Sequence, residues 1–277
     1  MPVGFRVRGL GLTNRPRRSG EVWDVEMNNM LFYEAVRTFA GPLFDFHYHF
    51  KTEGADNIPE EGGALIVANH RSLLDPIVIA YGVERFINFA EASYGFQIPV
   101  VKQLSRLTGA FPLSIYGGEE SDRNINEANQ LLERGELVGI FPEGVQSFFN
   151  PHRVTKMANF KTGFAKLALE NRVPIIPVAV VPEEERELPK IPGFLVSAYV
   201  KVPGAKDGLR LITYHGVTCR IGRPIDLSQF YDEPLTKALI DRVAGKIRRI
   251  VIKLYDGEEL DMFLTGEKLF DFANGMV

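Results

Sequence analysis

The apolar run ALIVA at residues 64–68 constrains the fold more than any other feature of this 277-residue chain. Five consecutive apolar residues, with no polar residue between them, are typical of a strand buried on both faces of a sheet. The segments LVGIF at 137–141 and VPIIPVAVV at 173–181 repeat this pattern. Segments with helical spacing lie between these runs. This alternation predicts a single α/β domain with a largely parallel central sheet flanked by helices.

The rest of the hydrophobic pattern predicts the other elements of the domain. Helices are expected near 72–81, 96–107, 121–134 (capped by Ser121), 159–171 and 234–255, and strands at 46–51, 85–90 and 110–115, with strand-like segments filling roughly 194–222. The expected layout is an irregular extension over 1–28, an amphipathic segment over 29–45, the domain over 46–257 and a tail over 258–277.

The composition excludes several classes of function. A net charge of -3 provides no basic stripe, so we expect no nucleic-acid partner. The single cysteine, Cys219, cannot form an internal disulfide, and its strand-like surroundings indicate a core residue. No stretch approaches the roughly 18–20 unbroken apolar residues of a membrane-spanning helix. Any contact with a membrane is therefore expected at its surface.

An apolar stripe at helical spacing precedes the domain and predicts an amphipathic helix. Its members are Phe32, Val36, Phe39 and Leu43. The pair Gly41-Pro42 is expected to kink or end this helix, because proline lacks an amide hydrogen and clashes with the preceding turn. Such a stripe suits either a membrane surface or packing on the domain, and periodicity alone does not decide between them.

The stretch NHRSLLD at residues 69–75 places a histidine and an aspartate directly after the apolar run. Asn69 and His70 fall at the carboxyl end of the predicted strand, where open α/β sheets usually bind ligands. With Ser72 as the N-cap of the next helix, Asp75 occupies its first turn at N3 and can reach the imidazole of His70. A histidine held this way can accept a proton on its other nitrogen. Alternatively, Asp75 completes a helix cap and His70 is an ordinary loop residue.

A second polar turn is predicted at the same edge of the sheet. The sequence FPEG at 141–144 follows the predicted strand 137–141 and brings Glu143 to that edge. Downstream, NFKTG at 159–163 places Lys161 near the start of a helix. Taken singly, each of these residues could be an ordinary helix-start charge.

A pair of histidines raises the question of a metal site. His47 and His49 alternate with apolar residues in a predicted strand and share its polar face with Asp45, Lys51 and Glu53. Two histidines on one face could ligate a metal, but a solvated charged face explains the pattern without one. We expect no metal.

In this order, the motifs resemble the lysophospholipid acyltransferase family, the glycerolipid acyltransferases of the His-x4-Asp type, similar to 1-acylglycerol-3-phosphate O-acyltransferase. The resemblance runs from about Phe32 to Gly257. NHRSLLD matches the first block of the family, GAFPLSI at 109–115 the second, FPEG the third, and VPIIPVAV at 173–180 the fourth.

The resemblance implies transfer of a fatty acyl group from acyl-CoA or acyl carrier protein to a lipid hydroxyl, with no cofactor and no covalent acyl-enzyme. His70 would act as general base and Asp75 would orient it, with backbone amides near Ser72 stabilising the oxyanion. Glu143 would position the acceptor. The residues expected to bind substrate are Asn69, Arg71, Ser72, Phe141, Pro142, Glu143, Gly144 and Lys161.

Two departures from the family pattern bear on the acceptor. Members that acylate glycerol phosphates usually have an arginine at the end of the second block and another in the third, where this chain has Ile115 and Gln146. Neither residue can replace the charge with which arginine binds a phosphate. This predicts an acceptor other than simple lysophosphatidic acid. Candidate phosphate contacts are Arg123, Arg153 and Lys156, which could equally be solvated loop charges.

The implied partners are a membrane lipid acceptor, the acyl thioester and the membrane surface. Because lipids with acyl chains stay in the bilayer, the resemblance favours the membrane-contacting interpretation of the segment 29–45. We expect a peripheral or monotopic protein on the cytoplasmic face of a membrane. Two alternatives remain: a thioesterase or lipid hydrolase, in which water replaces the lipid alcohol, and a lipid-binding membrane protein with a degenerate site.

Overall fold

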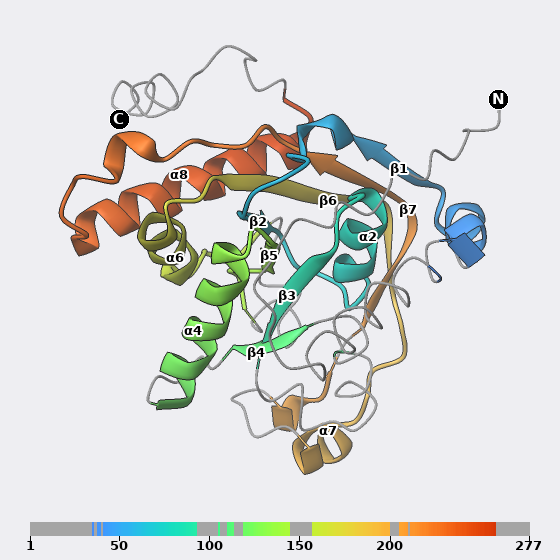
Figure 1. Ribbon diagram of the computed structural model, residues 1–277. Coiled ribbons are helices and arrows are strands. Elements are labelled where there is room, and N and C mark those ends of the chain that lie inside the picture. The colour runs from blue at the N-terminus through green and yellow to red at the C-terminus, as the bar shows by residue number, and fades with distance from the viewer. Residues whose placement is uncertain are drawn as a thin grey trace.

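The computed structural model describes residues 35, 38–39, 41–92, 105, 110–113, 119–144, 157–199, 205–209 and 211–258. Over these residues the chain forms a seven-stranded sheet in the order β1-β7-β6-β2-β5-β3-β4 (Figure 1). The strands are β1 (Phe50–Glu53), β2 (Ala64–Ala68), β3 (Ile87–Ala92), β4 (Phe111–Leu113), β5 (Leu137–Ile140), β6 (Ile175–Glu187) and β7 (Ile212–Ile221). All neighbouring pairs are parallel except β6 and β7. The prediction of a largely parallel sheet in an α/β domain is confirmed.

The apolar run at 64–68 forms the central strand β2, as predicted. All five of its residues are buried, and it pairs in parallel with β5 on one side and β6 on the other. Leu65 pairs with Val138 of β5 and with Ile175 of β6. Each fully buried side chain of this size contributes about 1.5–3 kcal/mol. The strand is apolar on both faces because both faces are covered by helices.

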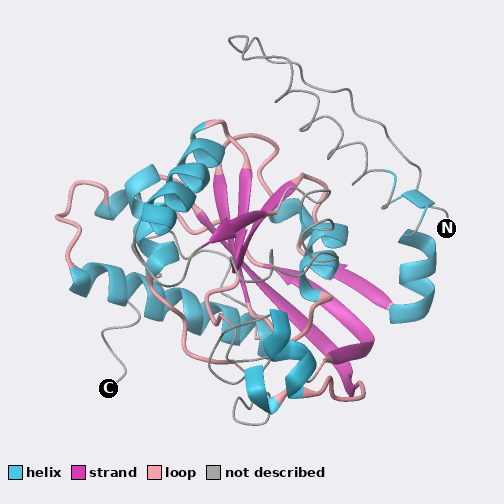
Figure 2. Cartoon of the chain, turned by 90° about the horizontal axis from the view of Figure 1, so that it is seen from below, coloured by secondary structure: helices cyan, strands magenta, loops and turns pink. Residues whose placement is uncertain are grey.

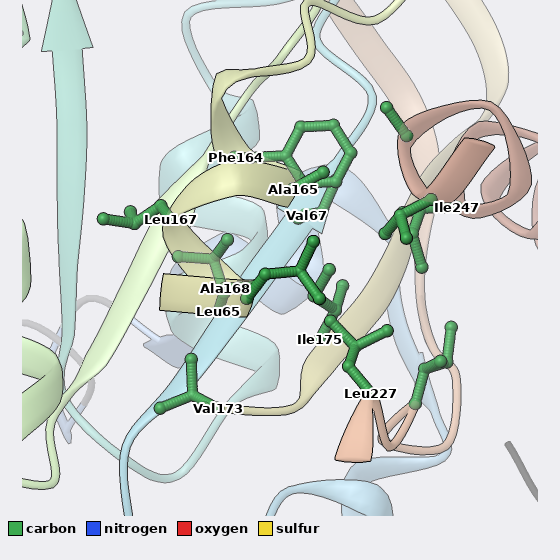
Figure 3. Close-up of a cluster of buried hydrophobic side chains, with 14 of the residues drawn as sticks. Leu65, Val67, Phe164, Ala165, Leu167, Ala168, Val173, Ile175, Leu227 and Ile247 are labelled. Atoms are coloured by element: carbon green, nitrogen blue, oxygen red, sulfur yellow. The ribbon is translucent and has the colours of Figure 1, made fainter. Parts of the chain in front are cut away.

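Three helices cover one face of the sheet, and α2 (Asp75–Gly82) covers the other (Figure 2). The three are α4 (Glu119–Glu133), α6 (Gly163–Asn171) and α8 (Lys237–Asp256). Figure 3 shows Ala168 of α6 beside Leu65 of β2, and Phe164 of α6 beside Val67, in the first of these cores. The second core contains Ile66 of β2 and Ile79 of α2. Among the described residues, no helix has the length and low polarity needed to cross a membrane.

The segment before β1 is helical where a strand was predicted. Residues 41–48 form a helix, and the strand begins only at Phe50. This helix contains Gly41-Pro42, and because residue 40 lies outside the described residues, the expected kink or end of the helix at this pair stays a prediction. Phe44 packs on Tyr48, one turn later, at 4.7 Å and on Tyr81 of α2 at 5.4 Å between ring centroids. The packing of Phe44 on both rings, and not the alternation at 46–50, decides the local structure.

Three further predictions differ from the structure. Gly193–Tyr199 forms helix α7, so the strand-like interpretation of 194–222 holds only for its second part, β7. The third predicted helix begins at Glu119, which places Ser121 inside α4 and not at its cap. His47 is helical and His49 follows with a left-handed φ of 44°, so the two do not share a strand face. The described part of the predicted helix 96–107 is Ser105 alone.

Candidate active site

The two polar motifs meet at one edge of the sheet. β2 and β5 are parallel neighbours whose last pair is Val67 and Ile140, so the residues that follow both strands leave the sheet together. The backbone amide of His70 donates to Oε1 of Glu143 at 2.8 Å. This confirms the prediction that the two motifs lie at the same edge, where a hydrogen bond joins them directly.

The predicted contact between His70 and Asp75 is present. Nδ1 of the imidazole lies 2.9 Å from Oδ2 of the carboxylate. The aspartate side chain is fully buried, whereas the histidine side chain is 15% exposed. When Nδ1 carries the proton that it shares with Asp75, Nε2 is the ring nitrogen that can accept one from a substrate.

The Asp75 carboxylate is the centre of a local hydrogen-bond network. Its Oδ2 also accepts from the backbone amides of Arg71 at 2.7 Å and Ser72 at 2.8 Å. Its Oδ1 accepts from the hydroxyl of Tyr214 at 2.5 Å. A buried carboxylate without donors would cost several kcal/mol. These donors compensate for that cost and fix the position of both oxygens.

The local geometry corrects two predictions about the start of α2. The helix begins at Asp75 with Leu74 as its N-cap, so Ser72 is not the cap and Asp75 is not at N3. The Ser72 hydroxyl instead donates to the carbonyl of Ile212 and accepts from the Leu74 amide. The amides of Arg71 and Ser72 donate to Asp75, so these two are not available to an oxyanion, and the expectation that backbone amides near Ser72 stabilise one stays a prediction for the other amides of this turn.

The loop that contains His70 is anchored to β6 on both sides of the histidine. The side-chain amide of Asn69 donates to the carbonyl of Val180 and accepts from its amide, at 2.9 and 2.8 Å. The Arg71 guanidinium forms a two-point ion pair with Glu185, at 2.5 and 2.8 Å. The bond to Glu185 raises the pKa of Arg71, although burial opposes it. These contacts leave the imidazole little room to move.

Glu143 links the His70 loop to a third segment. Its side chain is buried, and its Oε2 accepts from the amide of Ala158 at 2.6 Å while Oε1 holds the amide of His70. Arg248 of α8 donates to the carbonyls of Met157 and Ala158, at 3.0 and 2.9 Å. The carboxylate is therefore a clamp between two backbone segments, one of which α8 holds in place.

Aromatic rings form a wall beside the imidazole. The ring of His70 stacks on Phe141, with centroids 4.0 Å apart and an interplanar angle of 21°. Phe141 stacks in turn on Phe89 of β3 at 5.7 Å. The carbonyl of Pro142 accepts from the amide of Lys161 at 2.9 Å. This wall gives the edge an apolar side next to the polar network.

Lys161 and Gly144, both predicted to bind substrate, are neighbours in the structure. Gly144 has a φ of +66°, which favours glycine, and a Cβ there would lie 3.2 Å from Nζ of Lys161. The Lys161 ammonium thus lies beside the third block and brings a cation to the site. Arg153, Lys156, Ile115 and Gln146 lie outside the described residues, as does the side chain of Arg123.

Two site residues were missed by the sequence predictions. Tyr214 of β7 is buried, and both burial and the charge of Asp75 raise the pKa of its phenol well above the ordinary value. Glu91 is the penultimate residue of β3. Burial raises the pKa of its carboxyl, although the Ser105 hydroxyl that donates to it and the nearby His70 act in the opposite direction. Tyr214 belongs to no motif, but Glu91 could have been found from its place at a strand end.

Replacing Tyr214 with phenylalanine is expected to lower kcat/KM about tenfold and the free energy of unfolding by about 1–3 kcal/mol, because it leaves Oδ1 of buried Asp75 without its hydroxyl donor. Since the pKa of the phenol is raised, its contribution to stability is complete below about pH 10 and is lost only above that pH. Denaturant unfolding and initial rates test this. Tyr81→Phe is the matched control, because its hydroxyl donates to the exposed Asp45. Equal effects of the two variants would contradict the role of Tyr214.

Cys219 is fully buried, and burial raises the pKa of its thiol to about 12. The prediction that it is a core residue is confirmed. At pH 8 we expect no reaction with a thiol reagent in the native protein over minutes, and reaction of one thiol per chain in denaturant, because only the exposed thiolate is nucleophilic. With a reagent that releases a chromophore on reaction with a thiol, absorbance measures the labelling of the native and of the denatured protein. Rapid native labelling would contradict the burial of Cys219.

Within the described residues, no group of three or more histidine, cysteine, aspartate or glutamate side chains could hold a metal ion. His49 instead meets His215 of β7 edge-to-face, with ring centroids 5.3 Å apart.

Comparison with known proteins extends the resemblance found in the motifs. A family model described as Acyltransferase matches residues 49–181. An uncharacterised protein of Mycobacterium leprae is 29% identical over 175 residues, which cover 59% of this chain and 43% of that protein. The chain thus spans less than half the length of this relative. A 1-acyl-sn-glycerol-3-phosphate acyltransferase of Borreliella burgdorferi is 26% identical over 205 residues, 72% of each chain.

The fold also matches a solved structure. The crystal structure of the 1-acyl-sn-glycerophosphate (LPA) acyltransferase PlsC from Thermotoga maritima aligns with a TM-score of 0.57 and 21% identity. The alignment covers 84% of this chain and 81% of that one. At this identity the match supports the architecture, and the site must be argued from its own residues.

Proposed function

Residues 49–181 of this chain belong to the Acyltransferase family, and from this premise we propose that the protein is an O-acyltransferase. It moves a fatty acyl group from a thioester, acyl-CoA or acyl carrier protein, to a hydroxyl of a lysophospholipid or related lipid. The observation that carries the proposal is the contact between Nδ1 of His70 and buried Asp75 at the carboxyl edge of a parallel sheet. An imidazole oriented by a carboxylate at this edge is suited to activate an alcohol.

In the proposed reaction, Nε2 of His70 takes the proton of the lipid hydroxyl as its oxygen attacks the thioester carbonyl. Asp75 stabilises the imidazolium that forms. Collapse of the tetrahedral intermediate breaks the carbon–sulfur bond, and the imidazolium returns the proton to the leaving sulfur. Proton transfer of this kind is typically worth about 10²–10⁴-fold in rate.

Direct transfer, without an acyl-enzyme, agrees with the state of the candidate nucleophiles. The Ser72 hydroxyl is engaged by Ile212 and Leu74, and the Cys219 thiol is fully buried with a pKa of about 12. Neither side chain is placed to attack a thioester beside His70. The proposed acceptor is therefore the only nucleophile that the mechanism uses.

We assign supporting roles to most residues that the sequence placed in contact with substrate. The side chains of Asn69 and Arg71 bind β6, and Glu143 binds two backbone amides. They act by positioning His70. Phe141, Gly144 and Lys161 are the better candidates for contact with substrate, since they lie on the aromatic wall and at the third block beside it.

The acceptor is proposed to be a lipid other than simple lysophosphatidic acid. The sequence has Ile115 and Gln146 where phosphate-binding arginines are usual in the family, and the ammonium of Lys161 lies beside Gly144 of the third block. An ammonium provides one point charge for a headgroup, without the two-point geometry of arginine.

The same proposal places the protein on the cytoplasmic face of a membrane, through the helix before β1. Phe44 of that helix packs on Tyr81, whereas Phe39 and Leu43 of the predicted stripe and Phe46 are 72–83% exposed. Large apolar side chains exposed together suit a lipid surface. Phe32 and Val36 of the stripe lie outside the described residues.

Labelled acyl thioester offered with total lipid extract tests the function. The expected product is one acylated lipid class, identified by mass spectrometry, whose yield equals the thioester consumed. Accumulation of labelled fatty acid at equal rates with and without lipid would instead identify a hydrolase. The proposal would be overturned if neither acyl-CoA nor acyl carrier protein thioester were consumed with any acceptor.

A further inference from the structure

The connection between β6 and β7 carries an apolar surface that the proposed chemistry does not use. It contains α7 and a short 3-10 helix, η4 (Ala205–Asp207), and an antiparallel bridge between Ile191 and Leu209 closes its base. Phe194 is 73% exposed and Leu195 is 48% exposed. We call the described residues 188–199, 205–209 and 211 the α7 lobe.

The α7 lobe lies at the edge of the sheet that contains His70. β6 is parallel to β2, so it leaves the sheet on the same side. At the base of the lobe, Glu185 pairs with Arg71 and the Ile212 carbonyl accepts from Ser72. Figure 1 shows α7 at the bottom of the view, beyond β4. The strand ends that carry the lobe are thus hydrogen-bonded to the loop that positions the imidazole.

The charge of this segment differs from that of the chain. Lys190 and Lys206 flank the exposed apolar residues of the lobe and are themselves exposed. Over 188–211 the sequence has four basic residues and one acidic residue, a net charge of +3 in a chain of net charge -3. Exposed phenylalanine and leucine next to lysines match the interior and the anionic headgroups of a bilayer surface.

We propose that the α7 lobe is a membrane-contact surface that inserts Phe194 and Leu195 into an anionic bilayer and holds the His70 edge of the sheet against the lipid. It is separate in the chain from the helix before β1. The membrane contact is proposed independently of the enzyme activity. Only the further statement that it delivers a lipid substrate rests on the proposed function. An inserted lobe anchored to Arg71 and Ser72 shortens the path between the bilayer and the imidazole.

Binding of the full chain to vesicles tests the proposal. The double variant Phe194→Ser/Leu195→Ser is expected to bind vesicles of phosphatidylglycerol and phosphatidylcholine at least about tenfold more weakly than wild type, because it removes the apolar area that would be buried. Lys190→Gln and Lys206→Gln are each expected to weaken binding about fivefold on anionic vesicles and not on neutral ones. Cosedimentation measures all of these.

Leu235→Ser is the matched control. The exposed fraction of Leu235, 44%, is similar to that of Leu195. Leu235 follows the carboxyl end of β7, which is antiparallel to β6, and so lies at the opposite edge of the sheet. Its substitution should leave vesicle binding unchanged. All variants should keep the thermal midpoint of wild type, because their side chains are exposed.

The outcomes separate this proposal from the proposed function. Wild-type vesicle binding by Phe194→Ser/Leu195→Ser would overturn the membrane contact, even if the enzyme acylates lipids. A dimer in wild type that this variant converts to a monomer in light scattering would also overturn it, by assigning the surface to a second copy of the chain. Loss of vesicle binding together with unchanged turnover of a short-chain acceptor dispersed below its micelle concentration would support it. If wild type acylates nothing, the vesicle result stands alone.

Discussion

His70→Ala is expected to lower kcat/KM for acyl transfer by about 10²–10⁴-fold while leaving the protein folded. The imidazole is the proposed proton acceptor, and its loss leaves the lipid hydroxyl to attack without a base. The fold should survive because Asp75 keeps three other donors, from Arg71, Ser72 and Tyr214. Initial rates of labelled transfer and a thermal melt measure the two effects.

The matched control for this variant is His215→Ala. His215 is exposed on β7 and contacts the His49 ring, so its removal should change neither rate nor stability appreciably. Activity of His70→Ala within a few-fold of wild type would refute the assignment of the base. If His70→Ala fails to fold, the same rates are measured on His70→Gln, which keeps much of the side-chain volume and a hydrogen-bonding group.

Asp75→Asn is expected to reduce kcat/KM by a similar factor, about 10²-fold or more, since it removes the charge that stabilises the imidazolium. The neutral amide still fits the site. Its nitrogen can face Tyr214, whose hydroxyl can accept as well as donate, and its oxygen can keep the bonds to Arg71 and Ser72. The fold should therefore persist while the chemistry fails.

Nitrogen chemical shifts of labelled histidine measure the cause of this loss. The chain has five histidines, and the His70→Ala spectrum identifies the signal of His70. We expect neutral His70 to carry its proton on Nδ1 in wild type and a mixture of tautomers in Asp75→Asn. Wild-type rates in Asp75→Asn would show that the carboxylate only supports the loop.

The central strands and the His70–Asp75 contact could be predicted because their signals are local. Residues 64–68 and 137–140 are apolar throughout, which few structures except a doubly covered strand explain. His70 and Asp75 are five positions apart, so a strand end followed by a helix start brings them together whatever the rest of the chain does. The shared edge with Glu143 followed from parallel pairing.

The failures arise where distant contacts decide between similar local patterns. The apolar run at 193–199 fits a strand or a helix, and nothing in the run distinguishes them. The alternation at Phe46–Phe50 was overridden by the packing of Phe44 on Tyr81. Tyr214 is 139 positions from Asp75, and no pattern in its surroundings indicates that it donates to a carboxylate in another element.

The role of Glu143 illustrates the same limit within the site. Its place after β5 was predictable, but the orientation of its carboxylate depends on the segment at 157–160 and on Arg248 of α8. Sequence spacing therefore located the residue at the edge and left its partners undetermined. The structure assigns it to the backbone of His70, which is why we propose that it positions the base.

The central claim, that this site transfers an acyl group to a lipid hydroxyl, is tested most directly by thiol release from an acyl thioester in paired reactions with and without lipid acceptor. The account predicts that thiol appears only when a lipid acceptor is present, in an amount equal to the acylated lipid formed. Thiol release at the same rate in both reactions, or none with any lipid, would contradict it.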